Sequence, residues 1–247
     1  RSIRFVAEGA FDADRLVSAD VGCTDRNSVV LIGNGLLFKG HRGIYLLARD
    51  MTTHYVGADV EAYNNLEVVS AVLVDKKHQV RFGLANGPTL VYDYFLGQWS
   101  TFTNHPAVSA CTWQGKYCWL GVDGTVHVEN DGHKDGNSPV VLKIGTAPIN
   151  MAGIQGAQRV RRASFLGAKK SPHTVKLTAY TTRDGAEQSE SVTFDAKTAV
   201  KSGEEWLFRH HMKNQQGRSV RFEIEDSAQS GEETGEGFSL SNMTLEG

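Results

Sequence analysis

The chain has 247 residues, of which 40% are hydrophobic, and its 26 basic side chains nearly balance 28 acidic ones. This length is enough for one large all-β unit or for two ordinary domains with real cores. A net charge of −2 gives no reason to expect a general nucleic-acid binder. No apolar stretch approaches the roughly 18 residues that a membrane span needs. Glycine, with 26 residues against 5 prolines, indicates many tight turns and excludes collagen-like and proline-rich chains.

The N-terminal half of the chain consists of short β-prone runs bounded by turn residues, with no long stretch of helical periodicity. The clearest runs cover residues 29–32, 35–38, 43–47 and 68–74. A weak repeat joins them, because Val69-Ser70-Ala71 recurs 39 positions later as Val108-Ser109-Ala110, and Asn86-Gly87 recurs 37 positions later as Asp123-Gly124. A period near 40 built from three or four strands is typical of β-propeller blades, and ordinary antiparallel meanders are the alternative.

About three such blades fit between residues 28 and 130, whereas closed propellers typically need at least ~4. We therefore expect either that further blades precede Arg1, where the chain begins without a methionine, or that the sheets close against something else. Trp99 is expected in the core between blades, with a sugar-stacking platform as the alternative. Cys111 and Cys118 flank a predicted two-residue turn at Gln114-Gly115, which would place them opposite each other. We expect reduced, buried cysteines, and a strained disulfide stays open.

A polar, turn-rich junction at residues 129–139 separates this region from a second one. The second region alternates apolar and polar residues at period two, as strands with one solvated face do. Its predicted strands cover residues 159–161, 174–180, 191–194, 206–208, 219–225 and 238–245. The expected fold is all-β: a partial β-propeller of about three blades over residues 1–135, followed by an antiparallel jelly-roll-like β-sandwich over residues 136–247.

Charge in the second region is segregated along the chain. Residues 136–183 contain eight basic residues and no acid, whereas residues 222–247 contain seven acids and no basic residue. In one interpretation the two ends of a single sandwich pair, so that opposite charges face each other. In the other, a positive face meets a negative face on a neighbouring copy. The candidate interface residues are Arg159, Arg161, Arg162, Glu232, Glu233 and Glu236.

Signatures of catalysis are weak throughout. The sequence contains no nucleophile elbow, zinc-protease motif or phosphate loop. Ser18-Ala19-Asp20-Val21-Gly22 begins like a sialidase Asp-box but has Asp25 where an aromatic is expected, and Glu129, Asp131, His133 and Asp135 only faintly match a calcium loop. Adjacent His210 and His211 would point to opposite faces of a strand and so could not easily share an ion. We predict no catalytic, cofactor-binding or metal-binding residue, no cofactor, and a protein that is not an enzyme.

Several short sequence segments are nevertheless distinctive when taken together. They include residues 16–23, 28–30, 35–47, 55–64, 91–102 and 235–240, with Gly35-Leu36-Leu37-Phe38 and Gln98-Trp99-Ser100-Thr101-Phe102 among them. From about Leu16 to Leu245 the chain resembles the C-terminal part of tail nozzle or tail-hub proteins of tailed bacteriophages. The resemblance rests on short segments of structural character rather than on catalytic residues.

This resemblance implies a structural virion protein, assembled in the host cytoplasm, that forms a sixfold ring, a hexamer, around the DNA exit channel. The implied partners are further copies, the portal and adaptor proteins, and tail fibres or spikes, with genomic DNA passing through without sequence-specific binding and with no membrane contact. Two other functions stay open. A carbohydrate-binding or receptor-recognition module would use an exposed Trp206 or Tyr180, and a propeller glycosidase would need acids such as Asp20, Asp59, Asp93 and Asp123.

Overall fold

The computed structural model describes residues 5–7, 10–11, 20–130, 132–135, 138–150, 158–170, 173–195, 205–228 and 237–247. Within these ranges the chain is all-β, with several antiparallel sheets, none closed on itself, and three short 3-10 helices. It divides into two compact units, Arg1–Asn130 and Asp131–Gly247. No helix among the described residues has the length and apolar character needed to cross a membrane.

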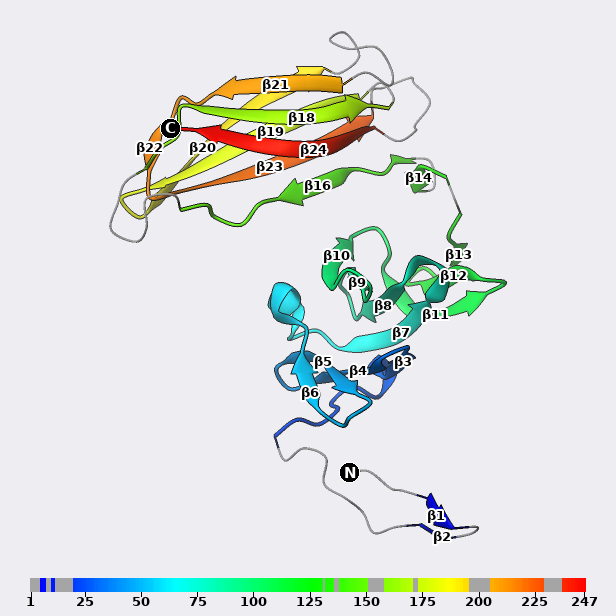
Figure 1. Cartoon of the computed structure of the whole chain (residues 1–247). Coiled ribbons are helices and arrows are strands. Elements are labelled where there is room, and N and C mark those ends of the chain that lie inside the picture. The colour runs from blue at the N-terminus through cyan, green and yellow to red at the C-terminus, as the bar shows by residue number, and fades with distance from the viewer. Residues whose placement is uncertain are drawn as a thin grey trace. The chain divides into compact units, whose positions relative to one another are not determined.

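The first unit contains three antiparallel meanders that follow one another along the chain (Figure 1). The first sheet is β3 (Val30–Ile32), β4 (Gly35–Gly40), β5 (Gly43–Ala48) and β6 (Thr53–Tyr55). The second sheet is β7 (Val68–Val74), β8 (Gln79–Leu84), β9 (Thr89–Asp93) and β10 (Gln98–Phe102). The third sheet is β11 (Ala107–Trp113), β12 (Lys116–Gly121) and β13 (Val126–Val128). The remaining elements are β1 (Phe5–Ala7), β2 (Ala10–Phe11), η1 (Arg26–Ser28), η2 (Ala58–Tyr63) and η3 (Asp75–Lys77).

The repeat seen in the sequence has a counterpart in strand pairing. The register of β7 on β8 shifts between Val68 and Ser70, and the register of β11 on β12 shifts between Ala107 and Ser109. These two irregularities lie 39 positions apart, the same spacing as the repeated Val-Ser-Ala phrase. A β-bulge bends its strand locally, so the second and third sheets share a bend as well as a strand order.

Apolar side chains join consecutive sheets of the first unit. Val30, Leu37 and Ile44 of the first sheet form one buried cluster with Val80 and Phe82 of the second. A second cluster, comprising Val74, Ala107, Tyr117 and Trp119, joins the second sheet to the third. A single sheet cannot bury a face alone, so stacking covers one face of the first and third sheets and both faces of the second.

Trp99 lies between the first two sheets, as expected. Its ring packs on Tyr92 with centroids 4.7 Å apart, and its indole Nε1 donates to the Val56 carbonyl oxygen at 2.7 Å. Val56 follows the first sheet, whereas Trp99 belongs to the second, so the contact ties the two sheets together. The partly buried indole is therefore part of the core and not a platform for a sugar.

The predicted turn at Gln114-Gly115 is present, and it sets Cys111 opposite Cys118. Both turn residues have positive φ, 50° and 74°, as a two-residue hairpin turn requires. All three cysteines are free thiols, and Cys118 is buried. The expectation of burial is wrong for Cys111, which is exposed, as is Cys23. Cys111 lies on the face of the third sheet opposite the one that packs on the second sheet.

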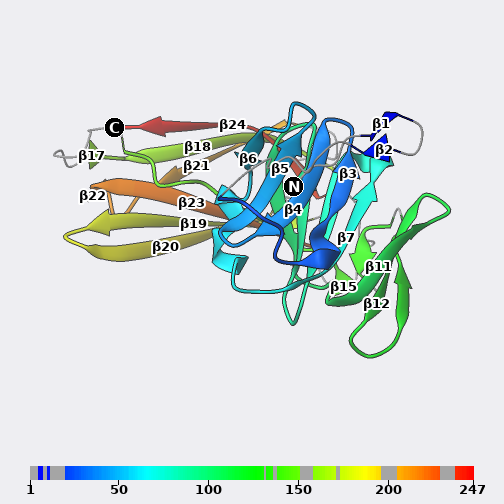
Figure 2. The same ribbon diagram turned by 90° about the horizontal axis from the view of Figure 1, so that it is seen from below.

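The second unit contains two antiparallel sheets that form separate layers (Figures 1 and 2). One sheet has the order β16 (Leu142–Gly145), β23 (Ser219–Ala228), β19 (His173–Arg183) and β20 (Ala186–Asp195). The other has the order β21 (Glu205–His211), β18 (Arg162–Lys169) and β24 (Phe238–Glu246). Two short pairs complete it: β14 (Lys134–Asp135) with β15 (Ser138–Pro139), and β17 (Gln158–Arg159) with β22 (Gln216–Gly217).

The two sheets share one apolar core. Phe165 of β18 and Phe222 of β23 meet edge to face with ring centroids 5.7 Å apart, and both are buried. The sequence predicted a strand at residues 159–161, but the central strand of the three-stranded sheet is Arg162–Lys169. Ser164, Gly167 and Ala168 are poor strand formers, so the pattern hid this strand. Its pairing on both sides with β21 and β24 holds it in place.

Candidate functional site

One end of the second unit gathers basic side chains from five strands. β18 begins there at Arg162, which faces both His211 at the end of β21 and Glu246 at the end of β24. The turn after Arg183 of β19 lies at the same end, because the Arg218 amide donates to the Thr182 carbonyl at 2.8 Å. Antiparallel pairing thus brings together segments that lie far apart along the chain.

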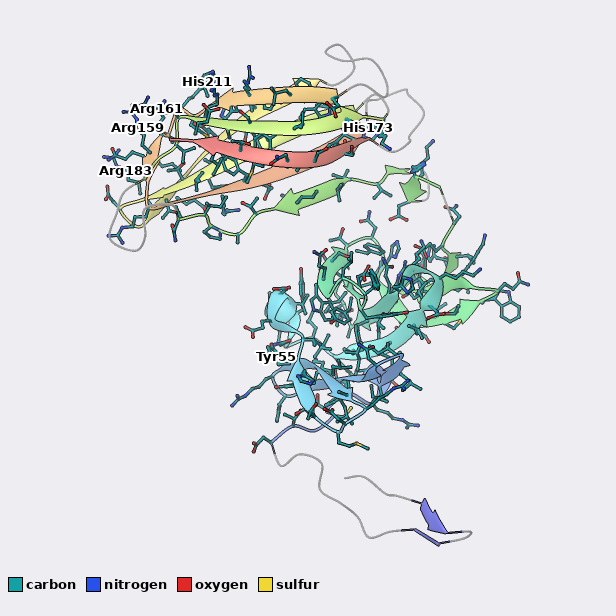
Figure 3. All side chains as sticks on the ribbon, viewed as in Figure 1. Tyr55, Arg159, Arg161, His173, Arg183 and His211 are labelled. Atoms are coloured by element: carbon teal, nitrogen blue, oxygen red, sulfur yellow. The ribbon has the colours of Figure 1, made fainter. Side chains whose placement is uncertain are left out.

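We call this region the basic end. Its described residues include eight lysines and arginines and four carboxylates. The cations are Arg159, Arg161, Arg162, Arg183, Arg209, Lys213, Arg218 and Arg221, and the carboxylates are Asp184, Glu187, Glu190 and Glu246. Figure 3 shows Arg159, Arg161, Arg183 and His211 projecting from this end, with His173 at the opposite end of the same unit.

Three of the four carboxylates hold a cation of the same end. Arg221 donates to Glu187 through Nε and Nη2 at 2.8 and 3.0 Å, and this hydrogen bond lowers the pKa of Glu187. Arg162 pairs with Glu246, and Arg183 approaches Asp184 at 3.5 Å. These pairs are exposed and so stabilise the fold only slightly.

The fourth carboxylate, Glu190, is almost fully buried and serves the backbone. Its oxygens accept the amide hydrogens of Lys213 and Asn214 at 2.9–3.0 Å, and Oε1 is hydrogen-bonded to His210 Nε2 at 2.8 Å. Glu190 therefore fixes the loop after β21. It leaves the Lys213 ammonium without a carboxylate of its own.

Five exposed cations remain that have no carboxylate partner in the described part of the chain: Arg159, Arg161, Arg209, Lys213 and Arg218. Arg159 donates instead to the neutral Gln215 side chain at 3.0 and 3.1 Å. A group of cations without counter-charges attracts an acidic surface and speeds its encounter. The basic end is therefore a candidate interaction surface.

The structure bears on each predicted interface residue differently. Arg159 and Arg161 belong to the unpaired set, whereas Arg162 is paired with Glu246. Glu232, Glu233 and Glu236 lie outside the described residues. Pairing within one unit, one of the two interpretations of the charge segregation, is present at Arg162–Glu246 and at Lys143–Glu223, where Nζ and Oε1 are 2.8 Å apart.

Sequence reasoning missed Arg209, Lys213 and Arg218. They lie beyond residue 183, in a second acid-free stretch at residues 206–222, which contains four basic residues and falls outside the range 136–183 singled out in the sequence. Only the pairing of β21 with β18, and of β22 with β17, brings them beside Arg159 and Arg161. The acid-free composition of residues 206–222 was the signal that could have found these cations, although it does not say where they lie in the fold.

The residues considered for carbohydrate binding have structural positions. Trp206 is buried between the two sheets, where its ring packs near Phe194 and Phe238 at centroid distances of 5.5 and 6.0 Å, so the expectation that it is exposed is wrong. Trp206 faces inward because it shares the strand face of Phe208, which also packs on the core. The face of Tyr180 is covered by the Arg221 guanidinium, 3.7 Å from the ring centroid.

Acids considered for glycoside hydrolysis are spread over separate elements. Asp93 accepts the Phe95 and Leu96 amides at 3.0 and 2.9 Å in the β9–β10 turn. Asp123 accepts the Thr125 amide and hydroxyl, which lower the pKa of Asp123. Asp20 precedes the first sheet and Asp59 lies in η2. Asp93 and Asp123 thus stabilise turns of different sheets.

Metal-ligating side chains do not gather in the described ranges, where no group of three or more His, Cys, Asp or Glu could hold an ion. Asp131 of the faint calcium-loop pattern lies outside those ranges, and Glu129 binds Lys77 and Arg81 instead. His210 points inward to Glu190 while His211 is exposed, as their opposite-face prediction required.

A buried polar pair lies at the end of the second unit opposite the basic end. His173 Nδ1 and Asp226 Oδ1 are 2.7 Å apart, and both side chains are almost fully buried. Burial raises the pKa of Asp226, although His173 acts in the opposite direction. The backbone of Gly237 packs directly on the pair, since a Cβ there would lie 2.3 Å from Asp226 Oδ2. The close approach of the backbone at residue 237 therefore requires glycine.

Comparison with family models and with curated proteins found no match for this chain.

Proposed function

We propose that this chain is part of a structural protein of a bacteriophage tail, a nozzle or hub that forms a ring lining the DNA exit channel and docks neighbouring tail proteins. The resemblance of residues 16–245 to such proteins supports the proposal. The protein acts without catalysis, within the virion, after assembly in the host cytoplasm.

The finer fold belongs to the same proposal. The three sheets of the first unit are successive blades of a propeller, and the bulge that recurs at the spacing of the sequence repeat supports this. The two packed sheets of the second unit form a jelly-roll-like sandwich, which their shared core supports. In the ring the blades build the wall and the sandwich contacts neighbours.

The observation that carries the functional proposal is the basic end. Its five exposed cations have no carboxylate partner among the described residues, and in this proposal a neighbouring subunit or tail protein supplies the carboxylates. The basic end does not line the channel in this proposal, because each phosphate neutralised by a cation increases affinity for DNA and would slow its passage. A protein interface is therefore the better use of these side chains.

The test is to express the full-length protein that contains this chain, measure its mass by mass photometry, and view it by electron microscopy. An antibody against residues 136–247 is applied to intact virions in parallel. We expect ring-shaped particles and labelling of the tail. A protein that stays monomeric and leaves virions unlabelled would contradict the proposal.

A further inference from the structure

The third sheet of the first unit has one covered and one open face. Ala110, Tyr117 and Trp119 point toward the second sheet and pack with Val74. Alternation along the strands sends Cys111, Leu120, Val126 and Val128 to the other side. On that side Leu120, Val126 and Val128 are 36%, 68% and 52% exposed.

The open face is built from two adjacent cross-strand rows. One row runs Ser109, Leu120, Val126, and the other runs Cys111, Cys118, Val128. Every residue in these rows except Ser109 is apolar or a thiol, and although Cys118 is buried, Leu120, Val126 and Val128 expose apolar surface beside the Cys111 thiol. Soluble proteins rarely leave such surfaces uncovered when they are contiguous.

The second sheet contains the counterparts of these rows. Ser70, Gly83 and Thr89 pair as Ser109, Leu120 and Val126 do, at offsets of 39, 37 and 37 positions. Val72, Arg81 and Val91 correspond in the same way to Cys111, Cys118 and Val128. In the second sheet these positions face the third: Thr89 is fully buried, and Arg81 and Val91 are each 1% exposed.

At the other end of the stack, the first sheet has an open face as well. Leu31, Leu36, Leu47 and Tyr55 point away from the second sheet, and Leu31 is 69% exposed, although Phe38 and Tyr45 on the same face are 6% and 9% exposed, so this face is open only in part. The matching face of the second sheet, with Val80, Phe82 and Tyr92, is the one that packs on the first sheet. The open face of the third sheet therefore corresponds to the face of the second sheet that packs on the third. The open face of the first sheet corresponds to the face of the second sheet that packs on the first.

We propose that the open face of the third sheet docks on the open face of the first sheet in a second copy of this chain. The docking continues the sheet-on-sheet stacking that already joins the three sheets within each copy. This contact is head-to-tail, so repeated copies close into a ring if the rotation per copy allows it. The inference deepens the proposed function and rests on it for the association of copies, because it names a second surface, besides the basic end, through which they associate.

Mass photometry over a range of concentrations tests the surface. Val126→Asp and Val128→Asp each place a charge on the open face, where the exposed side chain can be changed without disturbing the fold. The matched control is Leu207→Asp, because Leu207 is a similarly exposed apolar residue, at 50%, on the three-stranded sheet of the second unit. We expect the two open-face variants to associate at least about tenfold more weakly than wild type and the control to match wild type. Unchanged circular dichroism would show that each variant is folded.

Cross-linking tests the head-to-tail geometry. In a chain with Cys23, Cys111 and Cys118 replaced, one copy carries Val126→Cys and a second, of different tag size, carries Leu31→Cys. A short bismaleimide should join the two kinds of copy and should not join two Val126→Cys copies. Cross-links between like copies alone would overturn the head-to-tail arrangement.

The outcomes separate this inference from the proposed function. If Val126→Asp leaves the oligomer intact, or if wild type stays monomeric at every concentration, the second copy is not the occupant of this face and the inference fails. Antibody labelling of tails tests the virion assignment independently of either result. If the antibody labels the tails and the Val126→Asp oligomer is unaffected, the proposed function stands and the proposed interface is wrong.

Discussion

Arg81 of the second sheet and Glu129, the residue after the third sheet, form a buried salt bridge, with Nη2 and Oε1 2.9 Å apart. The guanidinium also lies over the rings of Tyr117 and Phe102, at 4.6 and 5.2 Å from their centroids. Lys39 and Asp25 play the corresponding role one sheet earlier: their Nζ and Oδ2 are 3.1 Å apart, and Asp25 also accepts the Val68 amide at 2.8 Å. A buried cation thus joins each pair of consecutive sheets.

Replacing Glu129 by Gln should destabilise the first unit by about 3–5 kcal/mol, because it leaves the Arg81 charge buried without its partner. Lys77→Met removes the second, more exposed partner of Glu129 and should cost less than about 1 kcal/mol. Urea denaturation measures both. Equal losses of unfolding free energy in the two variants would show that the buried Arg81–Glu129 pair stabilises the unit no more than the exposed Lys77–Glu129 pair.

Acid should weaken the same junction. Burial raises the pKa of Glu129, but hydrogen bonds and charge from Arg81 and Lys77 outweigh it and hold the pKa below its ordinary value. The stabilisation is present above the unfolded-state pKa and is lost as pH falls through the folded-state pKa. Unfolding followed from neutral pH into the acid range should show this loss in wild type and a smaller one in Glu129→Gln.

Alkaline conditions should destabilise the first unit through Tyr117. Burial raises the pKa of this phenol to about 12 despite the opposing charge of Arg81. The folded state therefore holds its proton between pH 10 and 12, where the unfolded chain releases it, so stability falls as pH rises across that window, by up to about 2–3 kcal/mol. Tyr117→Phe should remove this fall in unfolding free energy between pH 10 and 12. If Tyr117→Phe loses as much stability as wild type in that window, another group causes the effect.

Reversing charge at the basic end should weaken assembly with an acidic neighbour. The double substitution Arg161→Glu and Arg209→Glu changes two cations that have no ion pair among the described residues, whereas changing Arg162 would also break its pair with Glu246. We expect a loss of association of at least about tenfold, with a weaker salt dependence. The control variant Lys134→Glu with Lys176→Glu makes the same charge change elsewhere in the unit. An equal loss of association in this control would show that net charge, and not the basic end, causes the effect.

Gly167 of β18 should not tolerate a side chain. A Cβ at this position would lie 2.2 Å from the Ser239 carbonyl oxygen and 2.7 Å from the Trp206 ring, so the strand and the indole would have to separate. Gly167→Ala should lower the unfolding free energy by about 1–3 kcal/mol. Gly33, with open space where its Cβ would be, is the matched position. A Gly33→Ala variant as unstable as Gly167→Ala would mean that the space at residue 167 is not limiting.

Local patterns in the sequence were enough for much of the fold. Alternation at period two and turn residues predicted most strands, and Gln114-Gly115 alone set the β11–β12 register, because a two-residue turn leaves one way to pair its strands. Strand β18 escaped prediction because Ser164, Gly167 and Ala168 become a strand only through two paired neighbours. The sequence could not predict the pairing of Arg162 with Glu246, because this pairing also depends on β18 lying beside β24.

The sequence by itself determined that the chain is all-β, that strands and turns of its first half recur at a regular spacing, and that charge is unevenly distributed along its second half, because each of these properties depends on local patterns along the chain. Tertiary structure alone decided which charges remain unpaired and which faces remain open. Arg209 and Lys213 joined Arg159 only through antiparallel strands, and Val126 is exposed because no other described sheet of the first unit packs on its face of the third sheet. Pairing and stacking are contacts between distant segments, and composition does not record them.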